Sequence, residues 1–325
     1  MMNSRFKDEF HAEIPPVPAG MPRPNWSVLI PTYNCAEYLK ETLQSVLAQD
    51  PGPDNMEIIV VDGHSTKDDP GSVVKQCGQG RVRFVREPEN LGRIITYETG
   101  LKLSKGRLIH QLHGDDKVRP GFYARMATVL GENPQAGAAF CRTLYIDGNG
   151  KWKGLTGMEQ YEDGIMEDFL EKIVMSQRVQ TPSIVVRREV YEALGGFDLR
   201  QDRGQEDWEM WIRIACFYPV AFCNEVLAEY RAHPNQATRK DVAEGSSLRA
   251  YERICSIVDR YIPEAVLRKT RKKRSLEMAK YTLMMGVDIL GSQSSLRARL
   301  PYLYRALQLS RHPRIVFKVL KGLCP

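Results

Sequence analysis

Two adjacent carboxylates, Asp115 and Asp116, are the strongest candidates for chemistry in this 325-residue chain. They come shortly after an apolar segment, 108–112, that is typical of a buried strand. Neighbouring carboxylates repel each other unless a cation or solvent compensates their charge. Hard divalent ions such as Mg²⁺ and Mn²⁺ bind one or two carboxylates and leave positions for substrate phosphates. The pair therefore predicts a divalent-metal site. The alternative is a solvated turn that caps the helix beginning near Pro120.

A further carboxylate, Asp62, ends the β-branched segment 58–61. The carboxyl ends of parallel strands lie at one edge of a sheet, where ligands bind. We therefore expect Asp62 to face the same cleft as the acidic pair. The alternative is an Asx turn or a helix cap, a role that Ser65 and Thr66 fill equally well.

The elements that position these residues follow from apolar runs that alternate with helical patterns. Strands are expected at 27–30, 58–61, 82–85 and 108–112, and helices around 94–103 and 122–130. This alternation predicts an α/β fold with a mostly parallel, Rossmann-like sheet flanked by helices. After residue 147 we expect a strand at 183–186, a turn at 195–198 and a helix from 206 toward 215. From 242 onward the chain is expected to be helical.

Together these segments resemble family 2 glycosyltransferases, the large inverting group with the GT-A fold. The resemblance runs from about 26 to 238 in consistent order and spacing. It is carried by 27–39, 59–66, 89–92, 105–116, 195–198, 206–208 and 230–233. It implies a nucleotide-diphosphate-sugar donor, an acceptor hydroxyl and a divalent metal, Mn²⁺ or Mg²⁺.

The resemblance also implies roles for single residues. Thr32 and Tyr33 would line the pocket for the nucleobase and ribose, and Asp62 would contact the nucleotide. Asp115 and Asp116 match the metal-and-ribose motif of the family. Asp116 would be the direct metal ligand and Asp115 would contact the donor.

Asp207 matches the carboxylate that acts as general base in the family. Inversion requires the acceptor hydroxyl to attack from the face opposite the diphosphate, so a base must stand on that face. Arg231 would contact the departing diphosphate, and His233 would add a metal ligand or a diphosphate contact. The alternative role for Asp207 is to stabilise a helix N-terminus by its charge. Glu206 is the alternative base.

Three segments depart from the family pattern. Gly63 stands where a second Asp is frequent, and 113–114 is His-Gly where Asp-Ser or Ala-Asp is common. Residues 96–98, Thr-Tyr-Glu, replace a frequent Ala-Arg-Asn. These departures affect the choice of nucleobase more than the reaction, and a UDP-sugar is the favoured donor.

Three aromatic residues near these motifs have open or structural roles. Trp208 and Trp211, three residues apart on one expected helix, either stack on acceptor sugars or pack in the core. His110 lies in the middle of an expected strand, and we expect it to be a hydrogen-bonded core residue.

The formal net charge of +6 is unevenly distributed, since residues 267–325 hold 14 Lys and Arg against two acids. In the last expected helix one side is apolar and the other cationic. The apolar side carries Ile315, Val316, Val319, Leu320 and Leu323; the cationic side carries Arg311, Arg314, Lys318 and Lys321; an upstream apolar stripe has Leu300, Leu303, Tyr304 and Leu307. Such a helix is suited to an anionic membrane interface. The alternative is a helical subdomain that packs its stripe on the core.

These patterns predict a flexible leader at 1–24, a GT-A catalytic domain at 25–240 and a basic helical extension at 241–325. The expected acceptor is a lipid-linked saccharide used in cell-surface polysaccharide assembly. The expected location is the cytoplasmic face of the membrane, with peripheral attachment through the C-terminal helices. The seven scattered cysteines lack metal-binding spacing, which favours a reducing compartment.

Two other classes compete with this interpretation. A nucleotidyltransferase of the α/β class also uses carboxylates and metal, but the segment 31–34 has no basic glycine-rich phosphate loop. A non-catalytic nucleic-acid-binding protein would use the basic tail. No aromatic residues interleave with those charges and the rest of the chain is mildly acidic, so we expect no nucleic-acid partner.

Overall fold

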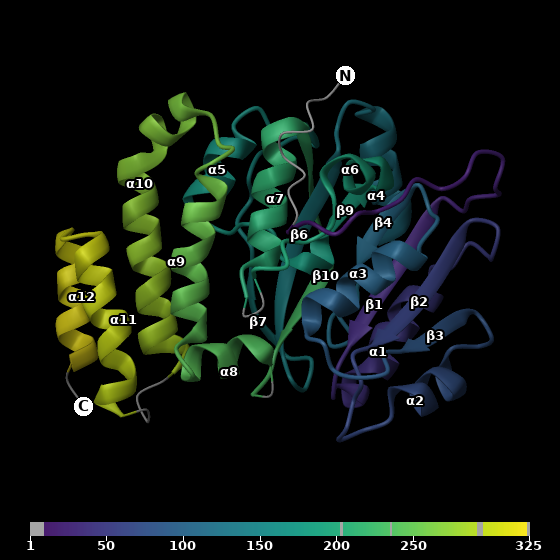
Figure 1. The fold of residues 1–325 in the computed structure, drawn as a ribbon, viewed down its shortest axis with the longest axis horizontal. Helices are drawn as coiled ribbons and strands as arrows, with labels where there is room; N and C mark the ends of the chain where they lie inside the picture. Colours follow the sequence, from purple (N-terminus) through teal and green to yellow (C-terminus); the bar gives the residue numbers. More distant parts are fainter. Residues whose placement is uncertain (1–9, 202–203, 235, 291–294, 324–325) are drawn as a thin grey trace. The chain divides into compact units, whose positions relative to one another are not determined.

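The computed structural model describes residues 10–201, 204–234, 236–290 and 295–323 (Figure 1). The chain divides into two compact units. The first unit comprises Met1–Glu167, Val179–Asp202 and Phe217–Ala232, and the second comprises Asp168–Arg178, Arg203–Cys216 and His233–Pro325. The boundary predicted at 240/241 stays a prediction, but two helices earlier in the chain already belong to the second unit.

The first unit is built on one sheet. Its strands are β1 (Trp26–Thr32), β2 (Met56–Asp62), β3 (Val82–Arg86), β4 (Leu108–Gln111), β5 (Lys117–Val118), β6 (Ala138–Asp147), β7 (Trp152–Leu155), β8 (Gly164–Ile165), β9 (Ile184–Arg187) and β10 (Val220–Ala232). The strand order is β3-β2-β1-β4-β9-β6-β10-β5, with β7 on β6 and β8 on β10. β3, β2, β1 and β4 pair in parallel, as do β6 and β10, whereas β9 is antiparallel to both neighbours. The predicted mostly parallel α/β fold is confirmed.

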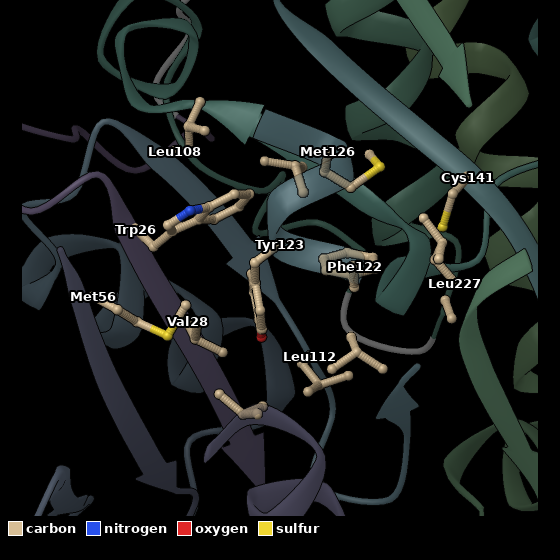
Figure 2. Packing of buried hydrophobic residues seen from close by; sticks show 14 of the residues in the cluster. Trp26, Val28, Met56, Leu108, Leu112, Phe122, Tyr123, Met126, Cys141 and Leu227 are labelled. Atoms are coloured by element: carbon tan, nitrogen blue, oxygen red, sulfur yellow. The ribbon is translucent and has the colours of Figure 1, made fainter. Parts of the chain in front are cut away.

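Helices cover the sheet of the first unit. They are α1 (Ala36–Leu47), α2 (Pro70–Cys77), α3 (Arg93–Leu103), α4 (Phe122–Glu132) and α6 (Arg188–Leu194), with a short 3₁₀ turn, η2 (Thr181–Ser183). On one face Trp26 of β1 meets Tyr123 of α4 edge to face, with ring centroids 5.0 Å apart (Figure 2). Gly100 of α3 packs on Leu29 of β1, which points to the opposite face. Each large apolar side chain buried in this way contributes roughly 1.5–3 kcal/mol.

Part of the predicted leader is held against the first unit. Ala12 O accepts a hydrogen bond from the N–H of Gly196, and His11 forms a β-bridge with Asp198. Ile14 is buried. These contacts hold residues 11–14 against the first unit, and the predicted leader at 1–24 otherwise stays a prediction. Residues 1–9 lie outside the described part of the chain.

The second unit is helical, as predicted from 242 onward. It contains α5 (Phe169–Met175), α7 (Glu206–Phe217), α8 (Ala237–Ala243), α9 (Ser246–Val258), α10 (Glu264–Leu283), the π-helical segment η3 (Met284–Ile289), α11 (Leu296–Leu309) and α12 (Pro313–Leu323) (Figure 1). Among the described residues, no helix combines the length and the apolar character needed to cross a membrane.

The apolar stripe of α12 is divided between the core of the second unit and its surface. Ile315 and Val319 are buried in a cluster with Leu283 of α10 and Ala306 of α11. This half of the stripe packs inside the helical unit itself. Val316, Phe317 and Leu320 remain exposed, the last two at 59% and 57%. The side chain of Leu323 lies outside the described part.

Candidate active site

Three polar segments meet at the carboxyl edge of the sheet in the first unit. Thr32 at the end of β1 is the register partner of Asp62 at the end of β2. The N–H of Gly63 donates to Thr32 O over 2.9 Å, and the N–H of Gly114 donates to Pro31 O over 3.0 Å. These bonds continue the parallel ladders beyond the strands and bring the 62–65 and 113–116 segments beside the end of β1.

The predicted nucleobase residues differ in exposure. Thr32 is buried, and its hydroxyl lies 2.9 Å from the Cys35 sulfur. Tyr33 is exposed at 46%, so its ring is accessible. A larger residue would be crowded at position 114, because a Cβ on Gly114 would lie only 3.0 Å from Thr32 Oγ1. Thr32 is therefore a buried residue at this edge of the sheet, and Tyr33 is an exposed one.

Asp62 is fully buried and its carboxylate has local partners. It accepts a hydrogen bond of 3.0 Å from the N–H of Ser65, three residues further along the chain. Arg86 Nη1 lies 3.3 Å from its other oxygen. The carboxylate is thus oriented by its own loop and by β3. Its predicted contact with the nucleotide stays a prediction.

Asp116 is not a solvated turn residue, because it is only 1% exposed. Its Oδ1 accepts a hydrogen bond of 2.9 Å from the N–H of Arg231, whereas its Oδ2 has no hydrogen-bond partner in the described part of the chain. Burial and the charge of Asp115 raise the pKa of the Asp116 carboxyl well above its usual value. A buried oxygen without a partner is costly, and a bound cation removes that cost.

The residues around Asp116 fit a divalent ion. His113, Asp115 and Asp116 each offer a ligand atom, and these atoms lie within 4.8 Å of one another. His113 was not among the residues predicted for the metal. The sequence feature that could have identified His113 is its position in the motif, where the family commonly has an acidic or small residue. Oxygen and imidazole ligands together suit ions such as Mn²⁺.

Arg231 holds the acidic segment in place from β10. Its Nε donates to Asp115 O over 2.8 Å, its Nη1 to Gly148 O over 3.1 Å and its Nη2 to Glu41 Oε2 over 2.9 Å. The guanidinium also lies over the Tyr38 ring, 4.7 Å from its centroid. These contacts give Arg231 a positioning role in the first unit. Its predicted diphosphate contact stays a prediction.

Asp207 and His233 belong to the second unit. Asp207 lies in the first turn of α7 and is partly exposed, and its Oδ1 accepts a hydrogen bond of 2.7 Å from the N–H of Trp208. Glu206, the alternative base, is buried. His233 is also buried, and its N–H donates to Gln236 Oε1. The roles predicted for these residues stay predictions.

Trp208, Trp211 and His110 have structural roles. Trp208 and Trp211 are both buried, and Trp208 stacks on Tyr251 with ring centroids 5.3 Å apart. Both tryptophans therefore pack in the core. His110 is fully buried between Pro182 O and the hydroxyl of Tyr123, which confirms its expected structural role.

The fold and this edge define a GT-A-type α/β protein with a carboxylate site at its strand ends. Residues 27–195 match the family model described as Glycosyl transferase family 2, which is more than half of the chain. The chain belongs to this family. An uncharacterised glycosyltransferase of Methanocaldococcus jannaschii is 29% identical over 220 residues, covering 66% of this chain and 73% of that protein. Glycosyltransferase AglE of Haloferax volcanii is 25% identical over 213 residues, covering 64% and 67%.

Solved structures share the fold. S. aureus TarS 1–349 superposes with a TM-score of 0.65 at 16% identity, covering 92% of this chain and 89% of that chain. The same TarS fragment has been solved with UDP-GlcNAc, and superposes with a TM-score of 0.63 at 15% identity and the same coverage. The mannosyltransferase PcManGT of Pyrobaculum calidifontis, solved with GDP-Man and Mn²⁺, superposes with a TM-score of 0.59 at 20% identity, covering 98% and 91%.

Proposed function

We propose that the protein is an inverting, metal-dependent glycosyltransferase that moves a sugar from a nucleotide-diphosphate-sugar to an acceptor hydroxyl. A UDP-sugar is the favoured donor. One observation carries the metal dependence: the buried Oδ2 of Asp116 has no hydrogen-bond partner in the described residues and lies among further ligand atoms. The solved complexes of TarS with UDP-GlcNAc and of PcManGT with GDP-Man and Mn²⁺ support the donor class.

In the proposed reaction the residues of the first unit bind the donor. Asp116 holds the ion, Asp115 contacts the donor, and Asp62 contacts the nucleotide beside Thr32 and Tyr33. When bound, the ion neutralises the charge that develops on the departing diphosphate. Arg231 contacts the departing diphosphate, and His233 contacts either the diphosphate or the ion.

Asp207 is the proposed general base. A carboxylate takes the proton of the acceptor hydroxyl as that oxygen attacks the anomeric carbon, and the bond to the diphosphate oxygen breaks. Asp207 is partly exposed, which makes it the better candidate than the buried Glu206. General-base help of this kind typically contributes roughly 10²–10⁴-fold to the rate.

A screen of donor hydrolysis tests this function. The full chain, dialysed against EDTA, is offered a panel of nucleotide-sugars with and without Mn²⁺. We expect hydrolysis of a UDP-sugar only when the ion is present, and loss of that activity in Asp116→Asn. Asp54→Asn, which changes an exposed aspartate of the same unit, is the matched control and should keep full activity. Full turnover in excess EDTA would refute the metal dependence.

We also propose that the helical unit attaches the protein to an anionic membrane surface, where it would meet a lipid-linked saccharide used in polysaccharide assembly. The proposed location is the cytoplasmic face. Leu296, Leu300 and Tyr304 are exposed and recur every four residues along α11, so they share one face. On α12 the exposed Phe317 and Leu320 are neighbours of exposed cationic residues. Apolar side chains beside cations suit the interface of an anionic bilayer.

A further inference from the structure

The imidazole of His113 lies beside the proposed metal-binding carboxylate. Its Nδ1 is 3.9 Å from Asp116 Oδ2, the oxygen that has no hydrogen-bond partner in the described part. We infer that His113 is a direct ligand of the divalent ion and gives the site a nitrogen donor. This inference rests on the proposed metal dependence and goes beyond it, because it names a ligand and a metal preference.

The separation of the two atoms is informative. At 3.9 Å it exceeds the donor–acceptor distance of a hydrogen bond, which is at most about 3.2 Å for nitrogen and oxygen. Two ligand bonds of about 2.0–2.2 Å to one ion span up to about 4.3 Å. Nδ1 and Oδ2 are therefore too far apart to satisfy each other directly and close enough to share a cation.

The orientation of the ring is set by its neighbours. Tyr97 of α3 stacks on His113 with ring centroids 5.5 Å apart and planes inclined by 18°. Tyr97 is itself buried and packs edge-on against Phe197, with centroids 5.4 Å apart. Because the stack restricts rotation of the imidazole, Nδ1 is held toward Asp116. Ligands held in this way need little rearrangement when an ion binds.

The second nitrogen of the ring has a partner suited to a metal-bound histidine. Gln111 Nε2 lies 3.4 Å from His113 Nε2, and the Gln111 amide is buried. A half-turn of that amide presents Gln111 Oε1, which has no hydrogen-bond partner in the described chain, as an acceptor for His113 Nε2–H. Metal-binding histidines usually donate their other N–H to such an oxygen, which leaves the facing nitrogen free to bind metal.

A nitrogen ligand changes which ions the site prefers. A site with only carboxylate and water ligands suits Mg²⁺. An imidazole ligand favours transition metals instead, and it favours the later ones more than Mn²⁺. We therefore expect the wild-type protein to bind Mn²⁺ and Co²⁺ more tightly, relative to Mg²⁺, than a variant in which residue 113 offers only oxygen.

Electron paramagnetic resonance of the Mn²⁺-loaded full chain tests the ligand directly. Loss of the free-ion signal measures binding, and pulsed spectra detect ¹⁴N nuclei bound to Mn²⁺. We expect a directly bound nitrogen in the wild type, and its absence in His113→Gln with Mn²⁺ affinity lowered about tenfold or more. His113→Asp should bind Mn²⁺ without the nitrogen signal and shift the preference toward Mg²⁺. His312→Gln, which changes an exposed histidine, should match the wild type.

The outcomes separate this inference from the proposed function. Binding of Mn²⁺ without a nitrogen signal in the wild type would overturn the role of His113 and leave the metal dependence standing. A signal that persists in His113→Gln and disappears in His233→Gln would assign the nitrogen to His233 and also overturn it. No binding of Mn²⁺ to the wild type would contradict both. Thermal melting of each variant establishes that it is folded.

Discussion

The carboxylate of Glu98 accepts a hydrogen bond of 2.6 Å from the backbone N–H of Phe197. Glu98 is buried in α3, and Phe197 belongs to the turn at 195–198 that carries part of the family resemblance. A Cβ added to Gly196 would overlap the same carboxylate. The helix that supports Tyr97 is therefore joined to this turn by one buried acidic side chain.

A substitution at Gly196 tests this contact. Gly196→Ala should lower the free energy of unfolding by about 1–3 kcal/mol, because the new methyl group must displace either the carboxylate or the turn. Gly157→Ala, at a position where a Cβ meets nothing within 4 Å, is the control and should change stability little. Denaturant unfolding measures both. Equal stability of the two variants would show that the turn yields without cost.

Asp207→Asn should separate chemistry from donor binding. The variant loses the proposed base but keeps its size and its helix position, so we expect kcat to fall roughly 10²-fold or more while donor affinity changes little. Steady-state kinetics and donor titration provide the two measurements. If donor affinity falls instead, Asp207 belongs to the donor site and Glu206 becomes the candidate base.

His110 makes stability depend on pH. Burial is the main cause that lowers its pKa from 6.5 to about 4, although the hydrogen bond to Pro182 O opposes the shift. The unfolded chain therefore binds one more proton than the folded chain between these values, and stability falls as pH drops through the window. Between pH 7 and pH 5 this amounts to about 2 kcal/mol.

Replacement of the imidazole checks the sign of this effect. His110→Gln should show a smaller loss of unfolding free energy between pH 7 and pH 5 than the wild type, whatever its stability at pH 7. Unfolding curves at the two pH values give that difference. An unchanged difference would mean that His110 has the same pKa in the folded and in the unfolded protein. Imidazole NMR would then show a titration near its ordinary pKa.

The exposed residues of α12 provide the test of membrane attachment. Phe317→Ser combined with Leu320→Ser should weaken binding to vesicles containing phosphatidylserine by about tenfold or more, since each apolar side chain that leaves water contributes about 1.5–3 kcal/mol. Tyr161→Ser, at an 84% exposed position of the first unit, is the control. Co-sedimentation at low ionic strength measures binding, which added salt should weaken.

Point substitutions are needed because truncation would remove core residues. A deletion of 300–325 takes away Leu303, Ile315 and Val319, which are buried against α10. Such a protein would expose Leu283 and lose part of the helical unit. If the double variant binds vesicles as the wild type does, or the wild type ignores them at low salt, α12 is a structural helix alone.

The first strands could be predicted from sequence because they are short, β-branched and separated by helical patterns. The long strands β6 and β10 were not predicted. The pairing of β10 with β6 shifts register between Cys223 and Val226 and again before Ala228, so no regular alternation marks the strand. Its pairing depends on β6, which lies far away in the sequence, and local propensity does not contain that information.

The acidic pair could be predicted because parallel strands bring their carboxyl ends together. The departures from the family pattern could be noticed but not explained, since each is linked to another across the fold. A Cβ on Gly63 would lie 2.8 Å from Thr96 Oγ1, and Tyr97 stacks on His113. Residues that differ from the usual family pattern therefore contact each other. Only the three-dimensional structure shows these contacts.

The two hydrogen bonds from Arg231 to the acidic pair have a consequence for ion capture. Both bonds link segments that are more than a hundred residues apart in the chain. The backbone N–H of Arg231 occupies Asp116 Oδ1 before any ion arrives, and its Nε holds the backbone oxygen of Asp115. The entropy of ordering these ligands is thus lost during folding and not during binding. The proposed ion site is therefore preorganised, and we expect its affinity to depend on the position of β10 as well as on the ligands. A substitution that loosens the end of β10 would weaken ion binding without touching a ligand.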